Sequence, residues 1–289
     1  MTAGISIRPL ATQADYDACV ELQRLTWGRD FNERVPSAVL RLAQHLGGIA
    51  SGAFDVDSAL LGFIFGMTGV REGRLVHWSD MLAVRPDARD RGLGEALKRH
   101  QRDELLARGI TRVYWTFDPL EARNAWLNFA RLGARADEYV RDCYANSDSP
   151  LHAGLPTDRL IVHWQLDDAR TADRLAGRTR APSMDEASTI PVINPPGRAA
   201  RHGAVAADAA VAIDCADART DLDAALLLLA IPARIQAIKA EDPSLAMRWR
   251  HVTRTAFEAY LPRGYSVTDA SRGEAWTGLV LERTAGSMV

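Results

Sequence analysis

Hydrophobic and polar positions in the first 166 residues follow two periods, that of strands and that of helices. Short apolar or alternating runs predict strands, whereas apolar residues that recur every three or four positions predict helices. The expected strands cover residues 5–10, 48–54, 59–70, 75–84, 113–117, 134–144 and 158–166. The expected helices cover residues 12–27, 36–45, 94–108 and 120–132.

The connections between these elements predict how the strands pair. Residues 55–58 and 72–73 are turn sequences, which favour antiparallel hairpins. The strands at 75–84 and 113–117 are joined by a helix, and a connection of this length implies parallel neighbours with a right-handed crossover. Such neighbours can splay apart. The predicted fold class is α/β (α+β), with a mixed, mostly antiparallel central sheet, one parallel splayed pair and flanking helices.

Beyond residue 167 the composition changes, which predicts three parts of the chain. Residues 1–167 form the first expected domain. Residues 168–202 contain several prolines and few large apolar side chains, which indicates a linker with short extended pieces. The remainder, 203–289, is expected to be a smaller α/β C-terminal domain with a strand fragment at 203–215, a buried strand at 224–231, two helices within 233–261 and a hairpin at 266–281.

A candidate anion site lies between the strand at 75–84 and the helix that follows it. Pro86 ends the strand, and the turn Arg89-Asp90-Arg91-Gly92-Leu93-Gly94 leads into the helix. Two glycines allow a sharp turn and a close backbone approach to a ligand. The first N–H groups of a helix have no intrahelical acceptor and lie at the positive end of its dipole. A pyrophosphate group suits such a site.

The segment V-R-P-D-A-R-D-R-G-L-G-E-A-L, residues 84–97, resembles the acyl-CoA-binding motif of the GNAT superfamily of N-acyltransferases. The similarity extends from about residue 5 to about residue 166 and leaves the last two-fifths of the chain uncovered. The resemblance implies that acyl-CoA is the co-substrate and that no metal is needed. It also implies the donor-binding residues: backbone pairing of the pantetheine arm with Leu82 and Val84, and a pyrophosphate cradle made of Arg89, Arg91, Gly92, Leu93, Gly94 and Glu95.

Acyl transfer to an amine requires a base that takes a proton from the attacking amine. The candidate is Asp80, which occupies the position where similar enzymes of the superfamily carry an acid-base side chain. Strand alternation places Asp80 on one face with Trp78, and His77, Ser79 and Met81 on the other, although relatives often have a bulge here. An Asp80 that only accepts a hydrogen bond remains an equal alternative. His77 is the competing base, with a better intrinsic pKa.

The chain departs from the family pattern at Phe129. Many relatives have a tyrosine four residues before the glycine, here Gly133, and its hydroxyl protonates the leaving thiolate. Phenylalanine has no proton to donate, so another group or water must supply it. The candidates are Asn128, Tyr139, Cys143 and Tyr144. The substitution also leaves open a catalytically degenerate protein that binds acyl-CoA without turning it over.

Part of the tail is similar in sequence pattern to the end of the first domain. Tyr260 lies four residues before Gly264, and two strands are expected to follow, as in the helix and closing hairpin of an acyltransferase. A degenerate half-GNAT lobe is therefore one interpretation of residues 203–289. The alternative is that the tail covers the sheet or acceptor pocket of the first domain, or makes a homodimer contact.

Composition and charge narrow the function classes. The 289 residues are 47% hydrophobic and 25% charged, and the formal net charge is −2, which gives no electrostatic case for nucleic acid or an anionic membrane. Cys19, Cys143 and Cys215 are scattered, so neither a disulfide framework nor a zinc site is indicated. No apolar signal segment or membrane-spanning run is recognisable, and a cytoplasmic protein is expected.

The resemblance also limits the acceptor. In the family the first helical pair borders the acceptor pocket, so Trp27, Phe31 and Arg34 become candidate substrate contacts. For each residue taken singly, a structural explanation is favoured, with Trp27 in the core and Arg34 as a solvated charge. The expected reaction moves an acetyl group, or a larger one such as succinyl, to the primary amine of a small molecule. An amino acid is one candidate acceptor. The alternative function is a catalytically silent acyl-CoA-binding or interaction protein.

Overall fold

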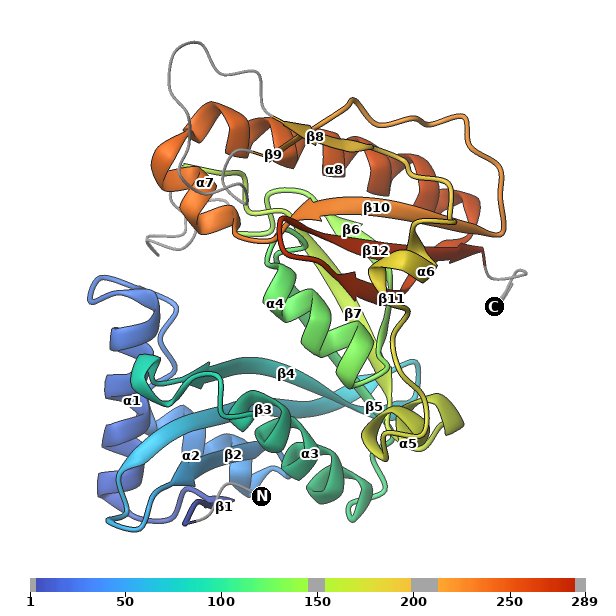
Figure 1. Ribbon diagram of the computed structural model, residues 1–289. Coiled ribbons are helices and arrows are strands. Elements are labelled where there is room, and N and C mark those ends of the chain that lie inside the picture. Colours follow the sequence, from blue (N-terminus) through green and yellow to red (C-terminus); the bar gives the residue numbers. More distant parts are fainter. Residues whose placement is uncertain (1–3, 145–153, 199–212, 284–289) are drawn as a thin grey trace. The chain divides into compact units, whose positions relative to one another are not determined.

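The computed structural model describes residues 4–144, 154–198 and 213–283 (Figure 1). The chain forms two compact units. The first contains Met1–Trp115 and Gln165–Asp168, and the second contains Thr116–Ala145, Gly154–Trp164 and Ala169–Val289. The expected first domain, 1–167, thus includes elements of both units, and its boundary stays a prediction.

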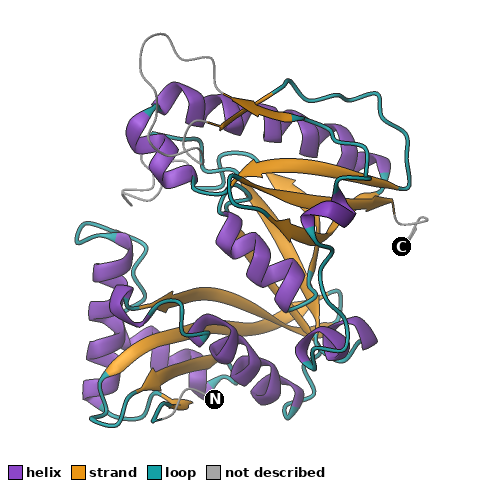
Figure 2. Cartoon of the chain, viewed as in Figure 1, coloured by secondary structure: helices purple, strands orange, loops and turns teal. Residues whose placement is uncertain are grey.

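The first unit is an antiparallel sheet with helices on both faces (Figure 2). Strands β1 (Ser6–Pro9), β2 (Ile49–Phe54), β3 (Leu60–Arg71) and β4 (Arg74–Val84) pair antiparallel in that order. The strand β5 (Arg112–Phe117) begins in this unit and pairs parallel with β4. The helices are α1 (Gln13–Trp27), α2 (Ser37–His45) and α3 (Leu93–Leu106), and a 3₁₀ turn, Pro86–Ala88, precedes α3. The predicted fold class is confirmed.

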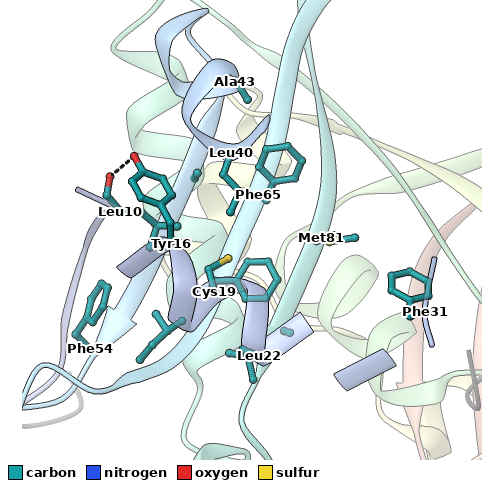
Figure 3. Close-up of a cluster of buried hydrophobic side chains, with 14 residues drawn as sticks. Leu10, Tyr16, Cys19, Leu22, Phe31, Leu40, Ala43, Phe54, Phe65 and Met81 are labelled. Atoms are coloured by element: carbon teal, nitrogen blue, oxygen red, sulfur yellow. Dashed lines mark hydrogen bonds between the residues drawn. The ribbon is translucent and has the colours of Figure 1, made fainter. Parts of the chain in front are cut away.

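The core of the first unit lies between the sheet and the helices α1 and α2 (Figure 3). Its side chains come from α1 at Tyr16, Cys19 and Leu22, from α2 at Leu40, and from the sheet at Phe65. The Tyr16 hydroxyl is buried in this cluster and donates to the carbonyl oxygen of Leu10, 3.1 Å away. Each fully buried aliphatic or aromatic side chain contributes about 1.5–3 kcal/mol relative to exposure, so this cluster fixes the α1 and α2 face.

A β-bulge interrupts β4 next to Asp80. Phe65 of β3 pairs with Met81, whereas Met67 pairs with Trp78. Between these two pairs β4 therefore contains one more residue than β3. A bulge of this kind bends the strand and changes the direction of a side chain.

The bulge changes which side chains share a face of β4. Before it, His77 and Ser79 bond to side chains of α3. After it, Met81 joins the cluster packed against α1 and α2. The expectation that Met81 faces the same way as His77 and Ser79 is wrong, because the extra residue shifts the alternation.

The strands of the second unit pair antiparallel in the order β7-β6-β11-β12-β10, which is part of one ten-stranded sheet. These strands are β6 (Arg135–Val140), β7 (Arg159–Gln165), β10 (Leu226–Pro232), β11 (Tyr265–Arg272) and β12 (Trp276–Arg283). The helices are α4 (Ala122–Ala125), a π-helix (Trp126–Arg131), α5 (Ala169–Leu175), α6 (Met184–Ala187), α7 (Ile235–Glu241) and α8 (Pro243–Tyr260), and the 3₁₀ turn Leu261–Arg263 follows α8. A short pair, β8 (Pro196–Arg198) and β9 (Ile213–Cys215), is separate.

Most expected elements of the tail are confirmed. The strand expected at 224–231, the helices separated at Asp242 and the final hairpin correspond to β10, α7 with α8, and β11 with β12. Of the strand fragment expected at 203–215, residues 203–212 lie outside the described residues, and β9 is the remainder. No helix in the described ranges is long and apolar enough to cross a membrane.

The segment expected as an extended linker contains two short helices, α5 and α6. Arg170 Nε of α5 donates to the carbonyl oxygen of Gly133 at 3.2 Å. Arg174 forms an ion pair with Asp269 of β11, and both side chains are largely buried. The sequence did not predict these helices because polar and ionic contacts, rather than a periodic apolar face, hold this segment in place.

Candidate functional site

The turn before α3 has the geometry of an anion site. Gly92 caps the helix in the left-handed conformation, with φ 73°, and no side chain bonds to the first turn as a cap. The helical hydrogen bonds begin with the N–H of Ala96, which donates to Gly92 O at 3.0 Å. The N–H groups of Leu93 and Gly94 therefore have no acceptor within the helix. A left-handed residue before these donors suits glycine, and anions bind at such helix starts.

Side chains around this turn hold it in place and leave its outer side open. The Leu93 side chain is buried and anchors the turn. Arg91 and Gly92 are exposed, and a Cβ atom placed on Gly92 would meet no atom within 4 Å. Glu95 forms an ion pair with Arg99, at 2.8 Å, within the helix. The turn is thus anchored by Leu93, while Arg91 and Gly92 are open to solvent.

The end of β4 lies beside this turn. Arg89 Nε donates to Val84 O at 3.3 Å, which joins two of the residues expected to bind the donor. Leu82 and Val84 pair with β3 on one side. On the other side, the parallel ladder with β5 ends at the pair Trp78↔Tyr114. The structure brings the candidate strand residues and the candidate cradle together on one continuous segment.

Asp80 lies at the bulge of β4, and its side chain is exposed. Desolvation by the surrounding protein raises the pKa of its carboxyl group, and a hydrogen bond with Trp78 partly opposes this shift. A raised pKa brings a carboxylate closer to the range in which a general base is effective. The structure therefore gives Asp80 two properties of a base, access to solvent and increased basicity.

His77 has the opposite environment. Its ring is fully buried, with Nδ1 3.3 Å from Thr68 Oγ1 and Nε2 3.1 Å from Gln101 Nε2. Burial and the charges of Lys98 and Arg108 lower its pKa to about 3. The imidazole is neutral near pH 7 and is held between β3 and α3, so it acts as a hydrogen-bonded core residue.

Lys98 was missed by the sequence reasoning. Its side chain is buried on the inner side of α3, and its Nζ donates to Ser79 Oγ at 2.8 Å and to Gln101 Oε1 at 3.4 Å. Nζ also lies 3.8 Å from the centre of the Trp115 ring. Burial lowers the pKa of Lys98 to about 7. A signal was present in the sequence, since Lys98 shares the inward helical spacing of Leu105.

The candidates for the thiolate proton belong to the second unit. Phe129 is fully buried and packs edge-on against Phe117, with ring centres 5.7 Å apart, and has no hydroxyl group. The Tyr139 hydroxyl donates to Asp158, and burial raises the pKa of Tyr139 above its usual range. The Tyr144 hydroxyl lies 3.0 Å from Thr116 Oγ1. Asn128 is buried and Cys143 half-buried.

The tyrosine of the tail helix is engaged by its own chain. The buried Tyr260 hydroxyl donates to the carbonyl oxygen of Arg219 at 2.6 Å and accepts from the N–H of Leu222 at 3.2 Å. Both hydrogen-bonding roles of this hydroxyl are used to fix a loop. Tyr260 therefore has a structural role here.

The helix that contains Phe129 differs from its prediction as one helix over 120–132. After α4 the backbone widens into a π-helix, and the N–H of Leu132 donates to the carbonyl oxygen of Leu127, five residues earlier. A π-turn accommodates one extra residue in a helical turn. The apolar pattern predicts a helix here but not that its hydrogen bonds change from the α-helical to the π-helical spacing.

The acceptor candidates of the first unit also lie together. Trp27 and Phe31 stack with ring centres 5.8 Å apart, and Arg34 Nε donates to the carbonyl oxygen of Phe31 at 2.9 Å. Phe31 belongs to the core cluster, whereas Arg34 is partly exposed. In the described part of the chain, no group of three or more His, Cys, Asp or Glu side chains could hold a metal ion.

Comparison with known proteins identifies a family for part of the chain. Residues 16–134 match the model of the acetyltransferase (GNAT) family. No curated protein is significantly similar to the chain in sequence. The resemblance expected from the turn before α3 is thus confirmed by a family model that includes this turn.

Solved structures with a similar arrangement include three acetyltransferases. The ribosomal-protein-S18-alanine N-acetyltransferase of Escherichia coli is 19% identical, with 57% of this chain and 96% of that chain covered and a TM-score of 0.43. Naa50 of Arabidopsis thaliana is 16% identical, with 56% and 98% covered and a TM-score of 0.44. A GNAT family acetyltransferase of Elizabethkingia anophelis with acetyl-CoA bound is 15% identical, with 57% and 99% covered and a TM-score of 0.44.

The family match coincides with the elements that carry the candidate site. It begins within α1 and ends just after the π-helix, and so includes β4 with Asp80 and the whole of α3. Residues 16–134 therefore form a GNAT acetyltransferase domain, which supports acyl-CoA-dependent N-acetyl transfer as the activity of this chain.

Proposed function

We propose that the protein transfers an acetyl group, or a larger acyl group such as succinyl, from acyl-CoA to the primary amine of a small molecule. An amino acid is one acceptor of this class. The reaction proceeds by direct attack of the amine on the thioester while both substrates are bound. The observation that carries this proposal is the open turn before α3, with its left-handed Gly92, at the end of the strand that presents Asp80.

The donor is held by its phosphates and its amide groups. The N–H groups at the start of α3, from Arg91 to Glu95, bind the pyrophosphate, and Arg89 adds positive charge beside it. The backbone of Leu82 and Val84 pairs with the pantetheine amides as an added strand would. Backbone N–H groups near Leu82 stabilise the oxyanion of the tetrahedral intermediate.

Asp80 takes the proton of the attacking amine. An amine is mostly protonated near neutral pH and must lose a proton to become a nucleophile. The exposed carboxylate of Asp80, with its raised pKa, can accept this proton directly or through a water molecule. The proton of the leaving thiolate then comes from water, because a coenzyme A thiolate is a fairly good leaving group and Phe129 has no proton to give.

A small-molecule acceptor is favoured over a protein. The chain has a long segment beyond the acetyltransferase domain, and a segment of this size more naturally encloses a pocket than opens a peptide groove. This argument rests on analogy between folds. Trp27, Phe31 and Arg34 are the proposed acceptor contacts. A cytoplasmic location, a homodimer and the absence of nucleic-acid or membrane partners belong to the same proposal.

Release of free thiol from acetyl-CoA and succinyl-CoA, measured with a panel of amines, tests this function. The Asp80→Asn variant keeps the shape of the side chain but loses the basic carboxylate. We expect its acyl-CoA affinity to stay within about twofold and its turnover to fall by roughly 100-fold, a typical loss for a general base. Equal turnover in the variant and the wild type would exclude Asp80 as the base.

Phe129 supports a second candidate function, an acyl-CoA-binding protein without turnover. The position expected to hold a proton donor has none, and the comparable Tyr260 is bound to its own backbone. Saturable acyl-CoA binding with no thiol release on any amine would favour this alternative. Turnover on any one amine would exclude it.

A further inference from the structure

Lys98 is an unusual buried cation next to the proposed catalytic strand. Its side chain is 4% exposed, and among the described residues no carboxylate forms an ion pair with it. A buried lysine without an ion-pair partner is costly to keep charged. Its position is fixed instead by hydrogen bonds to Ser79 and Gln101.

These contacts join α3 to the bulge of β4. The Nζ atom donates to Ser79 Oγ at 2.8 Å, and Ser79 is the residue directly before Asp80. The same Nζ lies over the Trp115 ring of β5, and a charged amine is attracted to such a ring. Lys98 thus links the side chain that immediately precedes Asp80 to two neighbouring elements.

We propose that Lys98 is a positioning residue for acyl transfer, which through Ser79 fixes the bulge of β4 and thereby the direction of the Asp80 carboxylate. The inference rests on the proposed function of Asp80. A bulge leaves one residue outside the regular ladder, so its conformation depends on side-chain contacts. A displacement of about 1 Å at a reacting group can cost up to roughly 100-fold in rate.

The charge of Lys98 makes this positioning depend on pH. The titratable group that interacts with Lys98 is His77 on β4, whose ring also bonds to Thr68 of β3 and is influenced by the charge of Arg108, while β5 contributes the Trp115 ring. His77 is neutral over the working range. Because the pKa of Lys98 is about 7, its ammonium form is lost as pH rises through neutrality. The attraction to the Trp115 ring is lost with it.

The decisive variant is Lys98→Met, with an unbranched side chain that fits a buried site. We expect its thermal stability to be unchanged or higher, its affinity for acyl-CoA to be unchanged, and its kcat to fall by roughly 10- to 100-fold at pH 6.5. The ratio of wild-type to variant kcat should decrease as pH rises above 7, because the neutral amine still donates to Ser79 but more weakly than the charged ammonium group. Ionisation of the acceptor amine cancels in this ratio. A ratio of one at all pH values would overturn the proposal.

Three further variants separate positioning from general structural damage. Ser79→Ala should lower kcat as Lys98→Met does, and Ser79→Thr, which keeps the hydroxyl, should restore most of it. His100→Met is the matched control on α3, because His100 Nε2 lies 3.0 Å from Ser51 Oγ of β2 and does not bond to β4. It should leave kcat and its pH dependence unchanged.

Amide hydrogen exchange provides a test that does not depend on turnover. In Lys98→Met the amides of residues 78–82 should exchange faster than in the wild type, while those of β2 stay the same. Unchanged exchange at 78–82 would overturn the positioning role. If the wild type transfers no acyl group to any amine, the proposed function fails, and the exchange result still decides the inference.

Discussion

The helices α3 and α8 begin in opposite ways. The start of α3 is a left-handed glycine, and no side chain bonds to its first turn as a cap. The start of α8 is closed by Asp242, whose carboxylate accepts from the N–H of Leu245 at 3.0 Å, and Pro243 occupies the first position and has no N–H. The first turn of α8 is thus capped by its own chain, whereas no side chain caps α3, where we propose that the pyrophosphate binds.

A second contrast lies between the π-helix that contains Phe129 and the end of α8. Phe129 and Tyr260 each lie four residues before a left-handed glycine, Gly133 and Gly264. The Tyr260 hydroxyl could donate a proton in principle, but the backbone of Arg219 and Leu222 already uses it. The tail therefore resembles a catalytic lobe in outline, while its polar groups are satisfied by its own chain. A ligand site therefore differs from a structural site in the partners of its polar groups, more than in where those groups lie in the sequence pattern.

The largest expected effect concerns the buried charges that hold α8. Asp158 is fully buried and accepts from Arg254 of α8 at 2.6 and 2.8 Å. Asp158→Ala leaves the mostly buried Arg254 with only its longer ion pair to Asp142, at 3.6 Å, and removes the acceptor of the Tyr139 hydroxyl. Loss of one partner of a buried pair costs about 3–5 kcal/mol, so denaturant unfolding should show a loss of this size. Glu258→Ala is a control on the same helix, α8, because Glu258 forms an exposed ion pair with Arg141. This variant should lower the free energy of unfolding by less than about 1 kcal/mol.

The second effect would make the start of α3 resemble that of α8. Gly92→Asp places a carboxylate at the cap, where it competes with the pyrophosphate for the first-turn donors and repels it. We expect acyl-CoA affinity to fall by roughly 30-fold or more, because hydrogen bonds to a charged group contribute about 1.5–3 kcal/mol each. Isothermal titration with acetyl-CoA measures this loss.

Gly109→Asp is the matched control for this variant. Gly109 is also left-handed, with φ 74°, and lies near the other end of α3, where an added Cβ atom would meet no neighbour within 4 Å. The two variants add the same charge and the same backbone strain. Similar affinities for Gly92→Asp and Gly109→Asp would contradict the proposed cradle.

The third effect tests the structural role of Tyr260. Tyr260→Phe removes the hydroxyl that bridges Arg219 and Leu222, and the free energy of unfolding should fall by about 1–2 kcal/mol. Turnover per folded molecule should not change. A lower kcat with unchanged stability would instead identify Tyr260 as a proton donor.

The smallest effect concerns α1, which is also capped by its own side chains. Thr12 and Asp15 form a capping box, and Arg8 bonds to Asp15 and holds the pKa of that carboxyl well below its usual range. A lowered pKa adds stability above about pH 4, which is lost as pH falls toward the lowered value. Asp15→Asn should reduce stability by about 1 kcal/mol at pH 7, since Arg8 is partly exposed, and by less near pH 2. Equal losses at both pH values would contradict this coupling.

The sequence alone determined the order of elements in the first unit, the turn before α3 and the family. Local signals were sufficient there: alternating apolar residues for β4, Pro86 as its end, and Gly92 where a left-handed residue is required. In the tail, the break at Asp242 and the final hairpin were also predicted, because proline, an aspartate cap and short apolar runs act within a few residues.

Only the tertiary structure decided the rest. The bulge of β4, the contacts of Lys98 and Ser79, the bonds of Tyr260 to residues about 40 positions earlier, and the ion pair of Arg174 with Asp269 all depend on partners far away in the sequence. A local pattern records whether a residue faces inward, but not which polar group it meets there. The chemistry of a buried polar side chain is set by that partner, so it appears only once the chain is folded.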